Sequence, residues 1–367
     1  MPKLFLVCTG LGIVKRGFET YISELAEKLY ENKLKFKTEL FSGGRYASKN
    51  ITSKQLFCIS RNNRFWRKTI GVSATSELEL YSFFFSLLLR VILQKPTAIY
   101  LGEYKLYCYL FKVRKLLRLD FSLVLYTGGQ ASSGLYDIQK DFVHHVTDIY
   151  YNDLINEGYP SERQFVIPHF VNFTNQIDFK LKSEIRRMAN GKKIIISVGI
   201  IDQSIKRMSS LVDILSKATD QYFPVLLGES SSETPLIIKK LENKFGKNNY
   251  FVQKVSKSDL PTYLNDADVF VLLSPKESFG LASLEALSVG LPVVCCDFKE
   301  SRYVLKDAAY LVNCEDEQLV LETIKFAIAT TGNIELKEKR KNFVEHNYSW
   351  RSLKSKYENM FNTILHV

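Results

Sequence analysis

The segment from residue 269 to residue 296 constrains the fold more than any other part of the chain. A short apolar run at 269–273 is typical of a buried parallel strand, and a second such run follows at 293–296. Between them, residues 281–289 have the composition of a helix that ends at Gly290. Two strands joined by a helix form a βαβ unit, whose strands lie parallel. The segment therefore predicts an α/β fold.

The same alternation of strands and helices extends over the whole chain. In the first half we expect a helix at 19–30 and strands at 3–7, 37–41, 98–101, 123–126, 146–151 and 164–167. In the second half we expect strands at 193–198, 225–227, 250–252, 269–273 and 293–296. With 367 residues the chain is too long for one ordinary core, so the pattern predicts two domains with helix-covered parallel sheets.

Two carboxylates stand eight positions apart within residues 269–296. Glu277 lies on the loop after a strand, where open α/β sheets bind ligands, and Glu285 lies one turn into the following helix. A carboxylate among apolar residues costs free energy unless a partner hydrogen-bonds it. The amides of Phe279, Gly280 and Leu281 open that helix and favour an anion. Sugar hydroxyls and phosphate oxygens would satisfy these groups.

The sequence ESFGLASLEALSVGLPVV closely resembles the Glu-x7-Glu signature of retaining glycosyltransferases of the GT-B fold, glycosyltransferase family 4. The resemblance implies two Rossmann-like domains that face each other across a cleft, with a C-terminal helix that crosses back to the N-domain. It also implies that Glu277 contacts the donor sugar and that Glu285 holds the nucleotide ribose. The donor-binding set that we expect comprises Gly17, Gly199, Lys206, Arg207, Glu277, Ser278, Phe279, Gly280, Leu281 and Glu285.

Two further segments resemble the same family. Gly17 and Glu19, after the first strand, match a loop that packs against the donor phosphate. The segment from Ser197 to Met208 matches the family's phosphate-binding segment, with Lys206 in place to neutralise the diphosphate leaving group. The family's Arg after Gly199 is replaced by Ile200, so we leave open whether Arg207 supplies that charge. A tight turn and a surface Lys-Arg pair are the plain structural alternatives.

The expected domain boundary lies near Pro168, in a segment that resembles the family's interdomain linker. The N-terminal, acceptor-binding domain would comprise residues 1–170 together with a C-terminal helix at 350–367 that Trp350 anchors. The donor-binding domain would comprise residues 171–349.

The acceptor side departs from the family pattern. Many members carry a His where this chain has Gly128 and Gly129, whose backbone amides we expect to face the acceptor. Glu103 also ends a strand at the expected cleft, and its carboxylate could bind or deprotonate an acceptor hydroxyl. A solvated loop glutamate is the alternative.

No metal site and no cofactor are expected. Asp266 and Asp268 spell DxD, but they stand where a helix closes before a core strand, as capping and turn residues do. His144 and His145 are adjacent, so their side chains diverge, and core or surface histidines are expected.

Composition narrows the partners and the compartment. The net charge of +11 suits anionic partners, but no nucleic-acid-binding motif is present. Four cations (Arg61, Arg64, Arg67 and Lys68) surround Phe65 and Trp66, which favours contact with an anionic membrane surface. A solvated charged face, or a loop that grips a soluble acceptor, is the alternative. The apolar run at 80–93 is too short to span a bilayer, and we expect a buried helix there.

The six cysteines show no CxxC spacing, which favours reduced thiols in a cytoplasmic protein. We expect no signal peptide, because the apolar run at 3–7 is too short.

The predicted activity is metal-independent, retaining transfer of a hexosyl or N-acetylhexosaminyl group. The donor would be a UDP- or GDP-sugar and the acceptor a glycan or lipid-linked saccharide. The site would lie in the cytoplasm or at the inner membrane face, in polysaccharide or glycolipid synthesis. A non-catalytic sugar-nucleotide-binding protein and a nucleotide-sugar epimerase are the alternatives.

Overall fold

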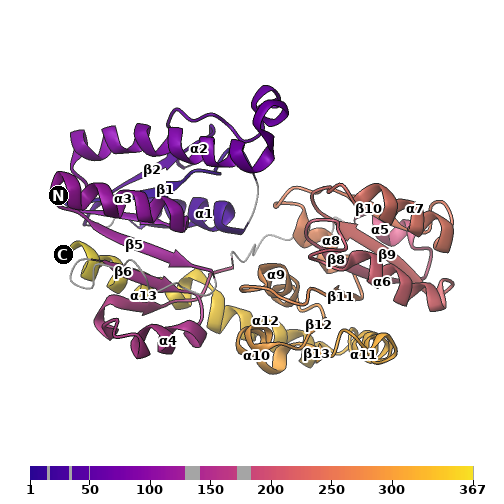
Figure 1. Cartoon of the computed structure of the whole chain (residues 1–367). Coiled ribbons are helices and arrows are strands. Elements are labelled where there is room, and N and C mark those ends of the chain that lie inside the picture. The colour runs from indigo at the N-terminus through magenta and orange to yellow at the C-terminus, as the bar shows by residue number, and fades with distance from the viewer. Residues whose placement is uncertain (15–16, 33–34, 49, 129–140, 172–182, 367) are drawn as a thin grey trace. The chain divides into compact units, whose positions relative to one another are not determined.

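A computed structural model describes residues 1–14, 17–32, 35–48, 50–128, 141–171 and 183–366 of the chain, which forms two compact units (Figure 1). Unit 1 comprises Met1–Pro168 and Lys354–Val367, and unit 2 comprises His169–Leu353. The sequence placed these limits at 170/171 and 349/350. The acceptor and donor roles of the two units remain predictions.

Unit 1 is built on a parallel sheet of order β3-β2-β1-β4-β5-β6-β7. Its strands are β1 (Lys3–Cys8), β2 (Lys37–Ser42), β3 (Lys54–Gln55), β4 (Ala98–Leu101), β5 (Ser122–Thr127), β6 (Phe142–His145) and β7 (Gln164–Val166). Leu4 to Cys8 of β1 are all buried, because a central parallel strand is covered on both faces and therefore consists of apolar residues. The chain order reverses between β1 and β4, and such a switch point is where open α/β sheets bind ligands.

Helices cover the unit 1 sheet. They are α1 (Gly17–Glu31), α2 (Arg64–Gln94), α3 (Tyr104–Leu117), α4 (Tyr151–Asn156) and most of α13 (Trp350–Leu365), with short 3-10 turns at Asp148–Tyr150 and Ser161–Arg163. The last helix packs on this unit through an apolar stripe. Phe361 contacts the rings of Phe36 and Tyr100, and the hydroxyl of Tyr21 donates to that of Tyr357 at 3.2 Å. The expected return of the C-terminal helix to the N-terminal domain is thus confirmed.

Unit 2 repeats the architecture with a parallel sheet of order β10-β9-β8-β11-β12-β13. Its strands are β8 (Lys193–Val198), β9 (Tyr222–Leu227), β10 (Phe251–Gln253), β11 (Val269–Leu272), β12 (Val293–Cys296) and β13 (Tyr310–Val312). Its helices are α5 (Glu184–Met188), α6 (Met208–Leu215), α7 (Thr234–Phe245), α8 (Leu260–Asp266), α9 (Leu281–Ser288), α10 (Lys299–Leu305), α11 (Glu317–Ala329) and α12 (Ile334–Tyr348), with 3-10 turns at Ser216–Ala218 and Lys306–Ala308. Here the order reverses between β8 and β11. Both units are therefore Rossmann-like, as predicted.

The structure corrects two local expectations and contains a strand that the sequence pattern did not predict. Residues 146–151, predicted as a strand, lie beyond β6 in a turn and the start of α4, and β13 was not predicted at all. The helix expected to be buried at 80–93 is the second half of α2, and only one side of it is buried: Phe83 and Leu87 are inside, whereas Phe85 and Leu89 are exposed. Among the described residues, no helix combines the length and the hydropathy needed to cross a membrane.

The expectation of six reduced cysteines is wrong for one pair. Cys296 and Cys314 form a disulfide, with their Cα atoms 5.2 Å apart. The pairing of β12 with β13 brings the two cysteines together, because it sets Cys296 opposite Val312, two residues before Cys314. Because this proximity depends on strand pairing rather than on local spacing, no CxxC motif announces it. Cys8, Cys58, Cys108 and Cys295 are free.

Candidate active site

The two loops with the strongest sequence signals leave the switch point of the unit 2 sheet. β11 pairs with β8 in parallel, so the loops that follow the two strands emerge side by side at the carboxyl edge. Lys206 lies on the loop after β8, and Glu277 lies on the loop after β11. Their side chains form an ion pair, and each is only about one-fifth exposed. The sequence predicted both residues for one site, and the structure brings them together.

The loop that carries Lys206 is fixed by its own backbone. The carboxylate of Asp202, which is 3% exposed, accepts hydrogen bonds from the amides of Lys206 at 2.7 Å and Ile205 at 3.2 Å. The aliphatic stem of Lys206 lies against Gly199, where a Cβ atom would come within 3.0 Å of Cε. The ammonium group is therefore held in place before any ligand arrives. Sequence reasoning did not single out Asp202, although an aspartate four residues before a loop lysine is a turn signal that the sequence shows.

The loop that carries Glu277 is anchored by an aromatic side chain. Phe279 is 3% exposed and packs against the rings of His169 at 5.0 Å and Tyr348 at 5.7 Å. Gly280 then adopts φ 72°, a left-handed conformation that suits glycine, and α9 begins at Leu281. Phe279 thus positions the loop with its side chain, and any contact with a ligand would come from the amides. The first amides of a helix have no intrahelical acceptor and can bind an anion.

Glu285 lies one turn into α9 and its side chain is 24% exposed. The Nζ atom of Lys257, which precedes α8, lies 3.9 Å from its carboxylate. Opposite charges at that distance attract each other. Ser278 lies on the same loop as Glu277, and Leu281 is the first residue of α9, so the predicted donor-binding group from 277 to 285 forms one continuous loop and helix.

Arg207 does not join the Lys206–Glu277 pair. It adopts φ 51°, and its guanidinium forms an ion pair at 2.6 Å with Glu315, beyond β13. Adjacent residues at the start of a helix point in different directions, which separates its charge from that of Lys206. In this arrangement, Arg207 does not supply the positive charge that the family's arginine would carry in place of Ile200.

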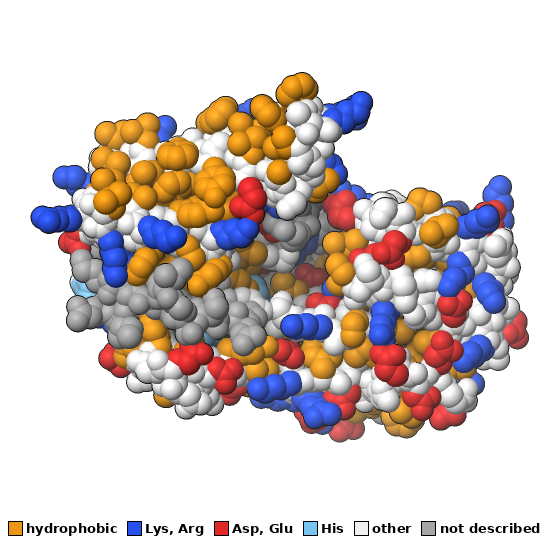
Figure 2. Space-filling view, viewed as in Figure 1, with side chains coloured by type: hydrophobic (Ala, Val, Ile, Leu, Met, Phe, Trp, Pro, Cys, Tyr) orange, Lys and Arg blue, Asp and Glu red, His pale blue; other side chains and the backbone are white. Residues whose placement is uncertain are grey.

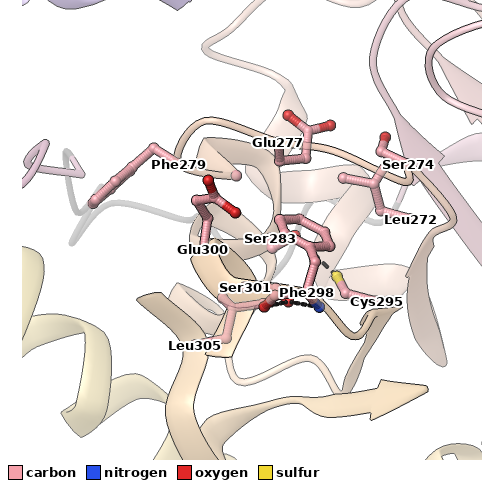
Figure 3. A pocket seen from close by; sticks show the side chains of 11 residues that line it. Leu272, Ser274, Glu277, Phe279, Ser283, Cys295, Phe298, Glu300, Ser301 and Leu305 are labelled. Carbon is pink, nitrogen blue, oxygen red and sulfur yellow. Dashed lines mark hydrogen bonds between the residues drawn. The ribbon is translucent and has the colours of Figure 1, made fainter. Parts of the chain in front are cut away.

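A small cavity lies behind the Glu277 loop (Figure 3). It holds about 20 Å³ and is lined by Leu272, Ser274, Glu277, Phe279, Gly280, Ser283, Cys295, Phe298, Glu300, Ser301 and Leu305. That volume suits about one water molecule, so the cavity is too small for a nucleotide. The hydroxyl of Ser274 is buried and has no hydrogen-bond partner among the residues that the structure describes. Burial also raises the pKa of the Cys295 thiol to about 12, which keeps it neutral.

The two aspartates of the DxD sequence have structural partners. Asp266 accepts a hydrogen bond from the Ser183 hydroxyl at 2.7 Å, and Asp268 accepts from the Ile194 amide at 2.8 Å and from Arg186 at 3.0 Å. Both carboxylates therefore tie α8 and β11 to neighbouring segments. Within the described ranges, no three His, Cys, Asp or Glu side chains are grouped as metal ligands.

The equivalent switch point of unit 1 has a different chemistry. Glu103 follows β4 and accepts hydrogen bonds from the amide of Thr9 at 3.2 Å and from its hydroxyl at 2.9 Å, just after β1. Burial, aided by the nearby Glu19 carboxylate, raises the pKa of Glu103 to about 7, against the pull of Thr9 and Arg61. Near neutral pH this carboxyl therefore exists in both protonation states.

The remaining predicted residues of unit 1 are spread along its carboxyl edge. Gly17 opens α1 with open space where a side chain would stand. Gly128 follows β5, and Gly129 lies outside the described residues. His144 and His145 are core residues of β6: His144 accepts from the Tyr100 hydroxyl at 2.7 Å, and burial lowers its pKa to about 3.

Comparison with known proteins places this geometry in a family context. Residues 178–350 match the family described as "Glycosyl transferases group 1". An O-antigen biosynthesis glycosyltransferase, WclY of Escherichia coli, is 20% identical over 159 residues, which cover 43% of this chain and 44% of that protein. The match therefore spans less than half the length of this curated relative.

Two solved structures share the fold over the full length. Sucrose-phosphate synthase from Thermosynechococcus elongatus superposes with a TM-score of 0.76 at 16% identity, covering 100% of both chains. HepE of Anabaena, solved with UDP and glucose, superposes with a TM-score of 0.69 at 12% identity, covering 99% of this chain and 100% of that one. At such identities the likeness establishes the GT-B fold.

Proposed function

Because residues 178–350 match the family of group 1 glycosyl transferases, we propose that the protein transfers a sugar from a nucleotide-diphosphate sugar to a glycan or lipid-linked acceptor. The observation that carries the proposal is the Lys206–Glu277 pair at the unit 2 switch point, beside the amino end of α9. A cation, an acid and the first amides of a helix at one sheet edge suit a ligand that combines phosphates with hydroxyls.

Each unit 2 group has a distinct role in this proposal. The ammonium of Lys206 and the first amides of α9 stabilise the diphosphate as its bond to the sugar breaks. Such preorganised electrostatic stabilisation is commonly the largest catalytic contribution. Glu277 exchanges part of its ion pair for sugar hydroxyls and orients the ring, and Glu285 binds the ribose. Lys206 supplies the charge that a metal ion would otherwise provide, so we propose metal-independent transfer with retention of anomeric configuration.

The acceptor is assigned to unit 1. Glu103 sits at the switch point, and its pKa of about 7 lets it accept or donate a hydrogen bond to an acceptor hydroxyl near neutral pH. The amides of Gly128 and Gly129 complete the proposed acceptor-binding set. The name of WclY supports a role in cell-surface polysaccharide synthesis, and the UDP and glucose in HepE support a UDP-sugar as the first donor to test, with GDP-sugars second. We place the reaction in the cytoplasm or at the inner face of the membrane.

The test is a panel of UDP- and GDP-sugars screened by thermal shift, followed by a transfer assay with the stabilising donor. NMR of the product then reads the anomeric configuration. We expect that one donor raises the melting temperature and is consumed when an acceptor is present. The product should have the same anomeric configuration as the donor. Stabilisation without consumption by any acceptor would favour a non-catalytic binding protein, which the missing Arg at Ile200 and the missing His at Gly128 make a real competitor. Conversion of one nucleotide sugar into its epimer would favour an epimerase.

A further inference from the structure

One side of α2 is apolar and exposed. Tyr81, Phe85, Leu89 and Leu93 recur every four residues, so they form a stripe along one face of the helix. Phe85 and Leu93 are each 66% exposed and Leu89 is 58% exposed. A helix that packs in a protein core buries such a stripe. Here the core takes the opposite stripe, which contains Phe83, Leu87 and Val91.

The apolar stripe continues onto the neighbouring helix and onto the start of α2. The rings of Tyr81 and Tyr109 stack at 5.1 Å, which places α3 beside α2. At the end of α3, Leu116 and Leu117 are exposed. At the other end α2 is broken at Gly71, and the short turn before the break exposes Phe65. These residues, together with Ile70, Val72 and Ile92, define the α2–α3 face, and Figure 2 shows hydrophobic side chains gathered over these helices.

Cations border this face and acids are scarce on it. The exposed cations between residues 64 and 118 are Arg64, Arg67, Lys68, Arg90, Lys95, Lys105, Lys112, Lys115 and Arg118. In the same stretch Glu77 forms an ion pair with Lys105, and Glu79 is buried against Arg61. The α2–α3 face therefore has a strong positive excess around an apolar centre.

The pairing of Arg61 changes the surface that the sequence suggested. Arg61 gives its backbone amide and its guanidinium to Glu79, whose side chain is fully buried, so it belongs to the structure of unit 1. The charges that remain available lie along the whole length of α2 and α3. The exposed surface is thus larger than the cluster at 61–68 and includes a longer apolar stripe.

We propose that the α2–α3 face docks unit 1 onto an anionic lipid bilayer. Exposed aromatic and aliphatic side chains enter the headgroup boundary, and the surrounding Lys and Arg side chains keep their charges at the phosphates while their stems lie on the apolar surface. Charge complementarity selects a bilayer over a neutral apolar partner, since an anionic leaflet attracts each nearby cation. Docking rests on this geometry alone. That it brings the enzyme to a lipid-linked acceptor rests on the proposed function.

The test is co-sedimentation of the full chain with vesicles of phosphatidylcholine alone and with vesicles that contain phosphatidylglycerol. We expect binding to the anionic vesicles at low salt, with a roughly tenfold or greater loss at about 0.5 M salt, where charges are screened. The double variant Phe85→Ser/Leu89→Ser and the double variant Lys112→Glu/Lys115→Glu should each lose roughly tenfold or more in binding. Both pairs are exposed, so circular dichroism should show an intact fold.

Matched controls come from unit 2. Leu236 and Phe326 are 71% and 62% exposed, so Leu236→Ser/Phe326→Ser removes similar apolar surface elsewhere. Lys239→Glu/Lys244→Glu reverses two exposed charges in the same way. Both controls should bind vesicles like the wild type.

Several results would overturn the docking surface. They are equal binding to neutral and anionic vesicles, no binding at low salt, and equal losses in the unit 2 controls. A dimer in light scattering that Phe85→Ser/Leu89→Ser dissociates, without vesicle binding, would instead show that the face pairs two copies. Transfer to a soluble acceptor should be unchanged in the α2–α3 variants, so a failure of docking can be told from a failure of the proposed activity.

Discussion

The two parallel sheets carry different chemistry at equivalent places. In unit 2, the loops after β8 and β11 bring Lys206 to Glu277, so a cation and an acid neutralise each other. In unit 1, the loops after β1 and β4 bring Thr9 to Glu103, and burial beside Glu19 favours the protonated acid. The same backbone arrangement thus carries a paired cation and acid at one edge and a buried acid at the other, which in the proposed function suit a diphosphate and an acceptor hydroxyl. Fold alone does not assign either role, because the side chains at the switch point decide it.

The largest expected effect comes from removing the unit 2 ion pair. Glu277→Ala and Lys206→Ala should each lower turnover roughly a hundredfold to a thousandfold, because preorganised stabilisation of the leaving group is lost. Steady-state kinetics measures this. Lys217→Ala is a matched control, since Lys217 pairs with Glu317 at 3.0 Å in an exposed position of the same unit. If Lys217→Ala and Lys206→Ala behave alike, the pair at the switch point has no special role.

The next effect concerns binding rather than turnover. Glu285→Ala should weaken nucleotide affinity by about 1.5–3 kcal/mol, roughly tenfold to a hundredfold, because a charged hydrogen bond to the ribose is lost. Calorimetric titration with UDP and GDP measures the affinity. Glu317→Ala, which removes a more exposed acid of the same unit, should bind nucleotide like the wild type. Unchanged affinity in Glu285→Ala would remove the ribose assignment.

The unit 1 acid should reveal itself through pH. Its pKa is about 7 in the folded protein and about 4.5 when unperturbed, so the folded state holds the proton more tightly. The resulting stabilisation is complete below pH 4.5 and is lost as the pH rises through 7. In Glu103→Gln the free energy of unfolding should therefore decline less as the pH rises. Between pH 5 and pH 8 the variant should gain stability of order 1–3 kcal/mol relative to the wild type.

Urea unfolding at pH 5 and at pH 8 measures this difference in the free energy of unfolding. Glu157→Gln, which removes an exposed acid of the same unit, is the matched control. A Glu103→Gln variant whose stability follows the wild-type pH profile would show that the carboxyl ionises normally.

The smallest expected effect is that of chelation. Activity should stay within about twofold of its starting value in EDTA, because Lys206 supplies the charge at the leaving group. The transfer assay before and after dialysis against EDTA measures this. Complete loss that manganese restores would reopen Asp266 and Asp268 as ligands.

Sequence reasoning worked best where the signal is local. The strand-loop-helix that carries Glu277 and Glu285 lies within 20 consecutive residues, so its elements follow from composition and spacing. The apolar runs of β1, β8 and β11 were found because buried parallel strands consist almost wholly of apolar residues. Lys206 was found from a resemblance rather than from a physical pattern.

The failures share a dependence on contacts between distant residues. The Cys296–Cys314 disulfide follows from strand pairing, and the Arg61–Glu79 pair joins a loop to a helix 18 residues later. The apolar run at 80–93 could not be divided into a buried and an exposed side, because both sides of α2 are apolar and only the packing of the sheet selects one. The pKa of Glu103 likewise comes from burial, which composition does not reveal.

In the proposed function, unit 2 binds the nucleotide through its switch-point loops. Hydrogen–deuterium exchange with saturating UDP or GDP tests it most directly, because amide protection reports binding without requiring an acceptor. We expect slower exchange at 199–207 and at 276–286, and no change at 98–104 in unit 1. Unchanged exchange in both unit 2 segments, when calorimetry shows that the nucleotide is bound, would contradict it.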